Sequence, residues 1–200
     1  MLVVKLHNRV TYIDSNPLFA TSVAEELRVL ATRISKSPDV VEAKLLIEIS
    51  RLERFALIET WTESTPTAAR EAPAYLDATG FLCSPPDERA GEAFSTGAAL
   101  PSDLTALNVL VHIDVVPFNL ALVGEWLRAE AEAARLAAGA LRYEIWRQAD
   151  RPNHFTAIQV WADHAAYAQH LASETTRAFR ANLLTMKGAL YDERLYHQAH

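Results

Sequence analysis

The sequence predicts an α+β fold: two ferredoxin-like modules of order β-α-β-β-α-β, whose antiparallel sheets pack into one α+β barrel within the chain. The chain repeats itself at an offset of one hundred residues, without a gap between Ile13 and Trp61. Such a self-match at a fixed period indicates tandem copies of one structural unit. The second observation is that strand-like and helix-like hydrophobic patterns follow the same order in both copies. The matching pairs include Ile13 and Ile113, Leu27 and Leu127, Phe55 and Phe155, and Trp61 and Trp161.

The first module is predicted to occupy residues 1–98. Its first strand, residues 2–13, is rich in Val, Leu, Thr and Tyr. A helix follows the capping sequence Ser15-Asn16-Pro17, with Val23, Leu27, Leu30 and Ile34 at helical spacing. Residues 40–50 and 54–62 form a predicted hairpin, and residues 64–77 form a weaker helix that contains two prolines.

The second module is predicted to occupy residues 104–200. It follows a linker, residues 80–103, which is rich in Pro and Gly and includes a short strand near residues 92–95. Asp163 is the expected N-cap of the module's second helix. The predicted elements are strand 104–116, helix 118–138, hairpin 140–149 and 154–162, helix 163–184 and strand 189–197.

The composition narrows the classes of function. The net charge is -6 and neither module has a dense Lys/Arg run, which argues against nucleic acid or an anionic membrane as a partner. No apolar run approaches the roughly 20 residues that span a bilayer. Cys83 is the only cysteine and no signal peptide is apparent at the start, so we expect a cytoplasmic protein without an intrachain disulfide.

Alternation along the strands predicts which side chains line a cavity between the two sheets. In the second module Val109, Val111 and Ile113 should lie under the helices, because they form a uniformly apolar face. The opposite face is mixed, as a ligand cavity requires. The residues expected to face the cavity are Asn108, His112, Tyr143, Phe155, Gln159 and Trp161, together with Asn8, Tyr12 and Trp61 of the first module.

Structural roles remain open for these residues. Phe155 and Trp161 could simply pack between the modules, since large aromatic side chains often seal such interfaces. Asn8 and Asn108 could satisfy nearby backbone groups. His112 could be a hydrogen-bonded wall residue or an acid, base or ligand anchor. Neither a helical His pair for a metal nor a nucleotide-binding loop is present in the sequence.

Several segments of the second module resemble the antibiotic biosynthesis monooxygenase family, including its quinol monooxygenase-like members. The stretch from Ala140 to Arg147 is similar to that family, as are Arg151-Pro-Asn-His-Phe-Thr and Val160-Trp-Ala-Asp. The similarity continues through Tyr167-Ala-Gln-His, Thr175-Thr-Arg-Ala-Phe-Arg and the closing segment from Leu190 to Tyr196. The first module is similar only as far as Trp61.

The resemblance implies a dimeric α+β barrel, formed here by the tandem modules, while further pairing into a homodimer stays open. It also implies oxidation of a small phenol, quinol or polyketide-type aromatic by dioxygen without a cofactor or metal. Asn108 and His112 would hydrogen-bond the phenolate and Trp161 would form an aromatic wall. His170 stands where many relatives have a histidine on the second helix. Arg180 could hold an anion at the cavity rim or lie on a solvated helix face.

Two alternatives remain. A haem-binding and haem-degrading relative in the same superfamily carries a strand Asn, a hairpin Trp and a helix His, for which Asn108, Trp161 and His170 are the candidates. The second alternative is a non-catalytic protein of this fold that binds a small ligand. The copies differ at both histidines, because Tyr12 matches His112 and Arg70 matches His170. We therefore expect one active site, lined mostly by the second module.

Overall fold

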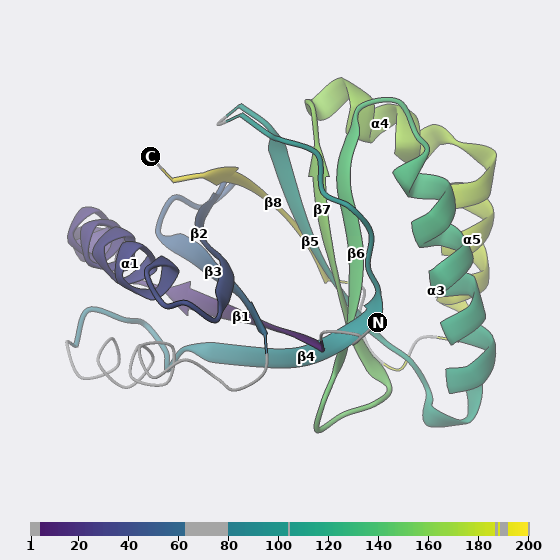
Figure 1. Ribbon diagram of the computed structural model, residues 1–200, viewed down its shortest axis with the longest axis horizontal. Coiled ribbons are helices and arrows are strands. Elements are labelled where there is room, and N and C mark those ends of the chain that lie inside the picture. The colour runs from purple at the N-terminus through teal and green to yellow at the C-terminus, as the bar shows by residue number, and fades with distance from the viewer. Residues whose placement is uncertain (1–4, 63–79, 104, 187, 189–191, 200) are drawn as a thin grey trace. The chain divides into compact units, whose positions relative to one another are not determined.

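The computed structural model describes residues 5–62, 80–103, 105–186, 188 and 192–199 (Figure 1). The chain divides into two compact units. Unit 1 comprises Met1–Glu92 and Tyr196–His200, and unit 2 comprises Ala93–Leu195. The weaker helix expected at residues 64–77 lies outside the described residues.

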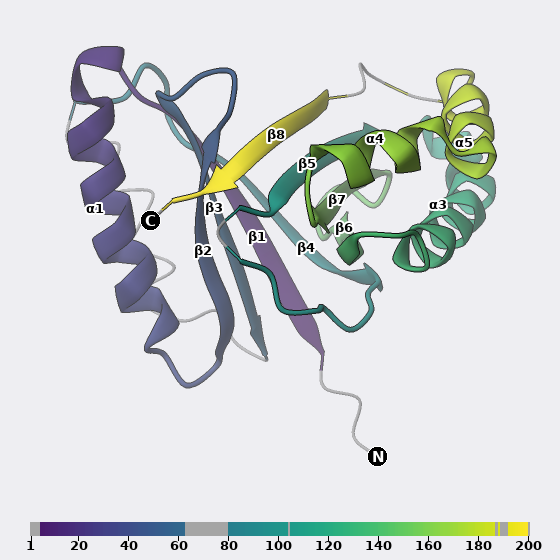
Figure 2. The same ribbon diagram turned by 90° about the horizontal axis from the view of Figure 1, so that it is seen from above.

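Unit 1 forms its core between one helix and one sheet, and Figure 2 shows the helix along that sheet. Val23, Leu27 and Ile34 recur at helical spacing and are almost fully buried. They pack in one cluster with Ile13 and Phe55 from the strands. Its elements are β1 (Leu6–Asp14), a 3₁₀ turn (Pro17–Phe19), α1 (Ala20–Ser35), β2 (Val40–Glu48), β3 (Arg54–Thr62) and most of β4 (Asp87–Ser95).

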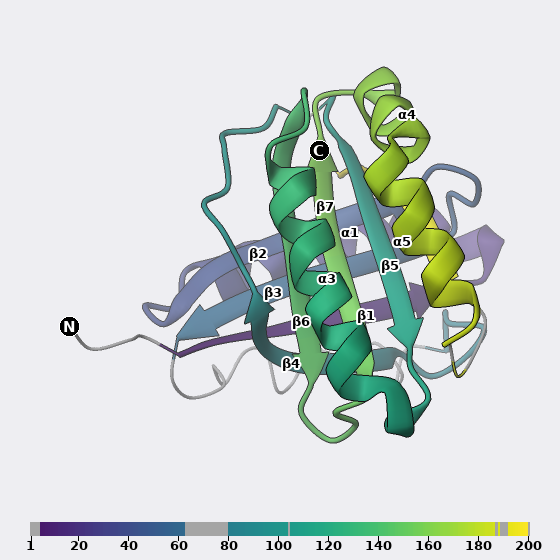
Figure 3. The same ribbon diagram turned by 90° about the vertical axis from the view of Figure 1, so that its right-hand side faces the viewer.

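Unit 2 repeats this plan, with its helices on one side of its sheet (Figure 3). The turn between its first helix and the next strand contains Gly139, whose φ of 77° suits a residue without a Cβ. Its elements are β5 (Leu107–Asp114), a 3₁₀ turn (Pro117–Asn119), α3 (Leu120–Arg135), β6 (Ala140–Gln148), β7 (His154–Trp161), α4 (His164–Ala172), α5 (Glu174–Leu184) and most of β8 (Asp192–Gln198).

The order of hydrogen-bonded strands closes on itself as β1-β3-β2-β8-β5-β7-β6-β4. Each module keeps the ferredoxin-like order, with its fourth strand beside its first. The boundary between the units falls inside β4, after Glu92, and inside β8, after Leu195, so each of these strands contributes residues to both units. In unit 1, for example, Ile47 of β2 pairs with His197 of β8. The expected α+β fold with a closed ring of eight strands is therefore confirmed.

Two elements differ from the sequence-based expectation. The strand expected near residues 92–95 starts earlier, at Asp87, because β4 pairs with β1 from His7↔Glu92 to Tyr12↔Asp87. The single helix expected after Asp163 is broken at Ser173, whose backbone is extended (φ -62°, ψ 149°). The Ser173 side chain accepts a hydrogen bond from the Thr176 N–H and so begins a new helix, α5.

The strand faces follow from the pairing register. Opposite residues of an antiparallel pair lie on the same face, and β5 pairs with β7 as Ile113↔Phe155, Val109↔Gln159 and Leu107↔Trp161. Val109 and Ile113 were predicted to lie under the helices. Unit 1 is consistent with this prediction, because Ile13, which matches Ile113 in the repeat, packs with residues of α1. Phe155, Gln159 and Trp161 were predicted to face away from the helices. This prediction is wrong, because their pairing with Ile113, Val109 and Leu107 puts them on the helix-facing side of the sheet.

Candidate functional site

Trp161 and His170 form the centre of an aromatic cluster on the helix-facing side of the unit 2 sheet. Trp161 ends β7 and His170 lies near the end of α4. Their rings stack with centroids 4.5 Å apart at an interplanar angle of 29°. Tyr143 of β6 meets His170 edge-on at 5.9 Å, and Tyr167 of α4 lies 5.9 Å from Trp161. We call these four residues the Trp161–His170 cluster. All four are buried.

Local hydrogen bonds hold the two central rings in place. The expected N-cap is present, because the Asp163 carboxylate accepts a 2.8 Å bond from the Ala166 N–H at the start of α4. This cap fixes where the helix begins and therefore which face carries His170. The Trp161 Nε1–H donates to Gln159 Oε1 at 3.0 Å, so the indole polar atom is satisfied inside the core.

Two polar residues missed by the sequence analysis contact His170. Thr176 Oγ1 lies 3.3 Å from His170 Nδ1 and donates a 2.9 Å hydrogen bond to Glu130 Oε1. The same carboxylate oxygen lies 3.5 Å from His170 Nε2, which is longer than a normal hydrogen bond. Glu130 Oε2 is buried and has no hydrogen-bond partner in the described structure. A glutamate on the buried stripe of α3 with Leu127 was the signal available in the sequence.

Burial shifts both titratable groups toward their neutral forms. Burial, assisted by the positive charge of Arg180, lowers the pKa of His170 to about 4. Burial also raises the pKa of the Glu130 carboxyl, although its bond from Thr176 and the charge of Arg180 oppose that shift. At neutral pH the His170 imidazole is therefore uncharged, with a proton on one ring nitrogen and a lone pair on the other.

A pocket of about 230 Å³ opens beside His170. It is smaller than the roughly 300–1,000 Å³ of sites for drug-sized ligands. Small side chains at the end of α3 and in the turn after it line one side, and polar groups of α4, α5 and Ser173 between them line the other. The lining residues are Ala133, Ala134, Ala137, Ala138, Gln169, His170, Ser173, Thr175 and Thr176.

Asn108 and His112 lie on the other face of the unit 2 sheet. His112 Nδ1 is 3.1 Å from Thr156 Oγ1, and Asn108 Nδ2 donates to the Ala106 carbonyl at 3.1 Å. Asn108 pairs with Val160, so its side chain is directed to the opposite side of the sheet from Trp161. The structure therefore brings Trp161 and His170 together but does not bring Asn108 to them. The haem-degrading alternative requires Asn108, Trp161 and His170 to meet at one site, and in this structure Asn108 lies on the other face of the sheet.

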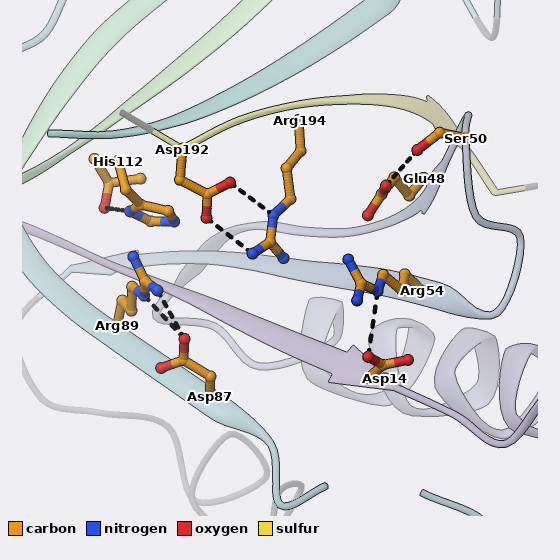
Figure 4. Close-up of polar contacts among 10 residues, drawn as sticks. Asp14, Glu48, Ser50, Arg54, Asp87, Arg89, His112, Asp192 and Arg194 are labelled. Atoms are coloured by element: carbon orange, nitrogen blue, oxygen red, sulfur yellow. Dashed lines mark hydrogen bonds and ion pairs between the residues drawn. The ribbon is translucent and has the colours of Figure 1, made fainter. Parts of the chain in front are cut away.

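Further polar residues that sequence reasoning missed lie on this face away from the helices. Glu144 Oε2 accepts hydrogen bonds from the Trp146 indole at 3.1 Å and from Arg142 at 2.7 Å. On β8, Asp192 and Arg194 form an ion pair at 2.8 Å (Figure 4). Alternation along β6 places Arg142, Glu144 and Trp146 on one face of that strand. The sequence does not show that this is the same face of the sheet as that of Asn108 and His112.

The other predicted substrate-contacting residues of unit 2 have protein partners. The Phe155 ring meets the Phe94 ring of β4 edge-on, with centroids 5.0 Å apart. The guanidinium of Arg128 on α3 lies over the Phe94 ring at 4.0 Å. Phe155 therefore packs inside unit 2, whereas the role left open for it was packing between the modules. Arg180 pairs with Glu193 at 2.5 Å. Tyr143 lies on the helix-facing side of the sheet, against the expectation that it faces away.

In unit 1 the predicted residues also split between two faces. Asn8 donates to the Glu59 carbonyl at 2.9 Å and to Thr60 at 3.0 Å, as expected of a buried amide that satisfies its neighbours. Tyr12 lies under Arg89, which is paired with Asp87 on the same strand (Figure 4). Trp61 stacks with His7 at 6.0 Å on the face that packs against α1.

Comparison with known proteins shows a family similarity in the second half of the chain. Residues 107–182 match the model of the antibiotic biosynthesis monooxygenase family. This matched segment contains the whole Trp161–His170 cluster, so the similarity to that family concerns the part of unit 2 that carries the candidate site. No curated protein sequence matches the chain.

Three solved structures share the fold along nearly the whole chain. A candidate monooxygenase from Fusobacterium nucleatum has a TM-score of 0.83 and 13% identity, over 100% of this chain and 94% of the other. One from Lactobacillus acidophilus has a TM-score of 0.76 and 11% identity, over 97% and 94%. An anthrone oxidase-like protein has a TM-score of 0.75 and 10% identity, over 99% and 92%. At these identities the likeness concerns the fold.

No helix in the described part of the chain is long and apolar enough to cross a membrane.

Proposed function

We propose that the protein is a cofactor-independent monooxygenase that oxidises a small phenol, quinol or polyketide-type aromatic with dioxygen. The observation that carries this proposal is the neutral, buried His170, which stacks on Trp161 and lines a pocket within the family-matched residues 107–182. We also propose a cytoplasmic location, with which the single cysteine, Cys83, agrees.

In the proposed reaction the substrate supplies the electrons. One oxygen atom of dioxygen enters the aromatic ring, and the other leaves as water with two hydrogen atoms from the substrate. A phenol with a free para position then becomes a quinone. Electron transfer to dioxygen is easier from a phenol whose hydroxyl proton is drawn away, so the protein needs a hydrogen-bond acceptor at that hydroxyl.

His170 suits this task because its imidazole is uncharged at neutral pH. Its Nε2 makes only a long 3.5 Å contact with Glu130 Oε1, and His170 lines the pocket, so we propose that the substrate hydroxyl donates to this nitrogen. The aromatic rings of Tyr143 and Trp161 around it keep the surroundings low in polarity. Low polarity strengthens that hydrogen bond and shields the radical pair that one-electron transfer creates.

Dioxygen uptake by the purified protein tests the proposal. We expect uptake with at least one member of a panel of hydroquinones and anthrone-like phenols, in the presence of a chelator and without added flavin. His170→Gln should reduce the rate by two orders of magnitude or more, within the range for lost acid–base assistance of roughly 10²–10⁴-fold. The matched control is His164→Ala, because His164 lies exposed on the same helix.

Three results would count against the proposal. No uptake with any substrate would favour a protein that only binds a ligand of this class. Equal rates for the two histidine variants would remove His170 from the reaction. Strict dependence on flavin or a metal would exclude the cofactor-free route.

A further inference from the structure

Thr176 and Glu130 form a hydrogen-bonded chain behind His170. Glu130 is on α3 and Thr176 is on α5, and both side chains are almost fully buried, with 2% and 3% exposure. A carboxyl group inside a helix–helix contact costs stability unless its polar atoms are satisfied. Among the described residues, Thr176 donates the one hydrogen bond that the Glu130 carboxyl accepts. The position of this costly group beside His170 indicates a role at that ring.

The distances around Thr176 Oγ1 decide the direction of the chain. A threonine hydroxyl has one proton to donate and can accept two hydrogen bonds. The shortest contact, 2.9 Å to Glu130 Oε1, takes that proton. Ser173 Oγ donates to Thr176 Oγ1 at 3.0 Å. The remaining contact, 3.3 Å to His170 Nδ1, then has to be a bond in which the imidazole donates.

We propose that Glu130 and Thr176 are positioning residues that hold the proton of His170 on Nδ1 and so leave the Nε2 lone pair to accept the substrate hydroxyl. The chain runs from His170 Nδ1–H to Thr176 Oγ1–H and ends at Glu130 Oε1. This inference rests on the proposed function for the role of Nε2, but the tautomer itself is a property of the protein without substrate.

Nitrogen NMR of ¹⁵N-histidine-labelled protein tests the tautomer directly, because protonated and unprotonated ring nitrogens have well-separated shifts. The His170 signals are assigned by their loss in His170→Gln. At pH 7 we expect the wild type to carry its proton on Nδ1. Thr176→Val keeps the side-chain size but removes the hydroxyl, so its proton should move to Nε2. Thr176→Ser and Glu130→Gln retain an acceptor along the chain and should keep the proton on Nδ1.

Activity supplies a second readout. Thr176→Val should lower kcat/KM for the phenol substrate by roughly tenfold, the size expected for one lost hydrogen bond, and Thr176→Ser should restore it. A wild-type proton on Nε2, or an unchanged tautomer in a folded Thr176→Val variant, would overturn the inference. If the protein oxidised no phenol, the proposed function would fail while the NMR result would still decide the tautomer.

Discussion

Trp161 and His170 stack face to face with 4.5 Å between their ring centroids, which ties the last residue of β7 to the end of α4. The stack adds a noncovalent connection between this helix and the sheet, beside the ring contacts of Tyr143 and Tyr167. The covalent link between the two elements runs through Ala162 and Asp163. The ring that lines the pocket is thus part of the core, so substitutions at the site affect stability as well as chemistry.

The first prediction concerns the stack itself. Trp161→Ala should lower the free energy of unfolding by roughly 3–5 kcal/mol, because it removes a fully buried indole and leaves a cavity. Trp161→Phe keeps an aromatic ring against His170 and should cost less. Urea unfolding followed by circular dichroism measures both values. A loss below about 1 kcal/mol for the alanine variant would mean that the stack does not hold α4 to the sheet.

The second prediction concerns the pH dependence of stability. The pKa of His170 is lowered from 6.5 to about 4 in the folded protein, so the unfolded chain takes up the proton first as the pH falls. The stability contributed by the neutral imidazole is complete above about pH 6.5 and is lost between that value and about pH 4. Over this window the wild type should lose roughly 3 kcal/mol relative to His170→Gln, at about 1.4 kcal/mol per pKa unit.

Unfolding in urea at a series of pH values from 4 to 7.5 measures this difference. Glu130, whose pKa is raised, acts in the opposite sense because its contribution is lost as the pH rises. It is present in both proteins, so its effect largely cancels. Parallel pH profiles for the two proteins would contradict a lowered pKa for His170.

The third prediction concerns the start of α4. Asp163→Ala removes the acceptor for the Ala166 N–H and should cost about 1 kcal/mol of stability, while Asp163→Asn should retain most of it. Since the cap positions the helix, the alanine variant should also weaken binding of the phenol substrate. Thermal unfolding and a substrate titration report the two effects. Asp150→Ala, at a bend after β6, serves as the surface control.

The fourth prediction uses the repeat to test a buried ion pair in unit 1. Arg9 binds the carboxylate of Glu59 at 2.7 Å, and both side chains are nearly inaccessible. The second module has Val109 and Gln159 at the matching positions. Arg9→Val alone should cost roughly 3–5 kcal/mol, because it leaves a buried carboxylate without its partner. The double variant Arg9→Val/Glu59→Gln copies the second module and should recover at least half of that loss. Equal stability of the single and double variants would refute this account.

The order of the first strand, the first helix and the hairpin could be predicted because the repeat between Ile13 and Trp61 supplied these patterns twice. The face of β5 was also predictable, since Val109, Val111 and Ile113 are uniformly apolar. In β7 both faces mix polar and apolar side chains, as Gln159 beside Trp161 and Thr156 beside Ile158 show. Periodicity alone cannot decide which of two mixed faces lies under a helix. That information resides in the register with β5, which appears only when the strands pair.

The candidate site was predictable in part for a similar reason. Trp161 and His170 were found through a family resemblance, and the structure places them in contact. Glu130 and Thr176 were missed because they lie 46 positions apart and meet only where α3 packs on α5. A glutamate within an apolar helix stripe signals a buried partner, but the sequence does not show which residue that partner is.

The division of β4 and β8 between the two units has a consequence for the folding of the two copies. A cut at the repeat boundary would leave each half without residues that complete its sheet, because the last residues of the chain belong to unit 1 and Ala93–Ser95 belong to unit 2. Deletion of either copy should therefore destabilise the other copy as well. The first copy therefore contributes to the folding of the second whether or not it has chemistry of its own.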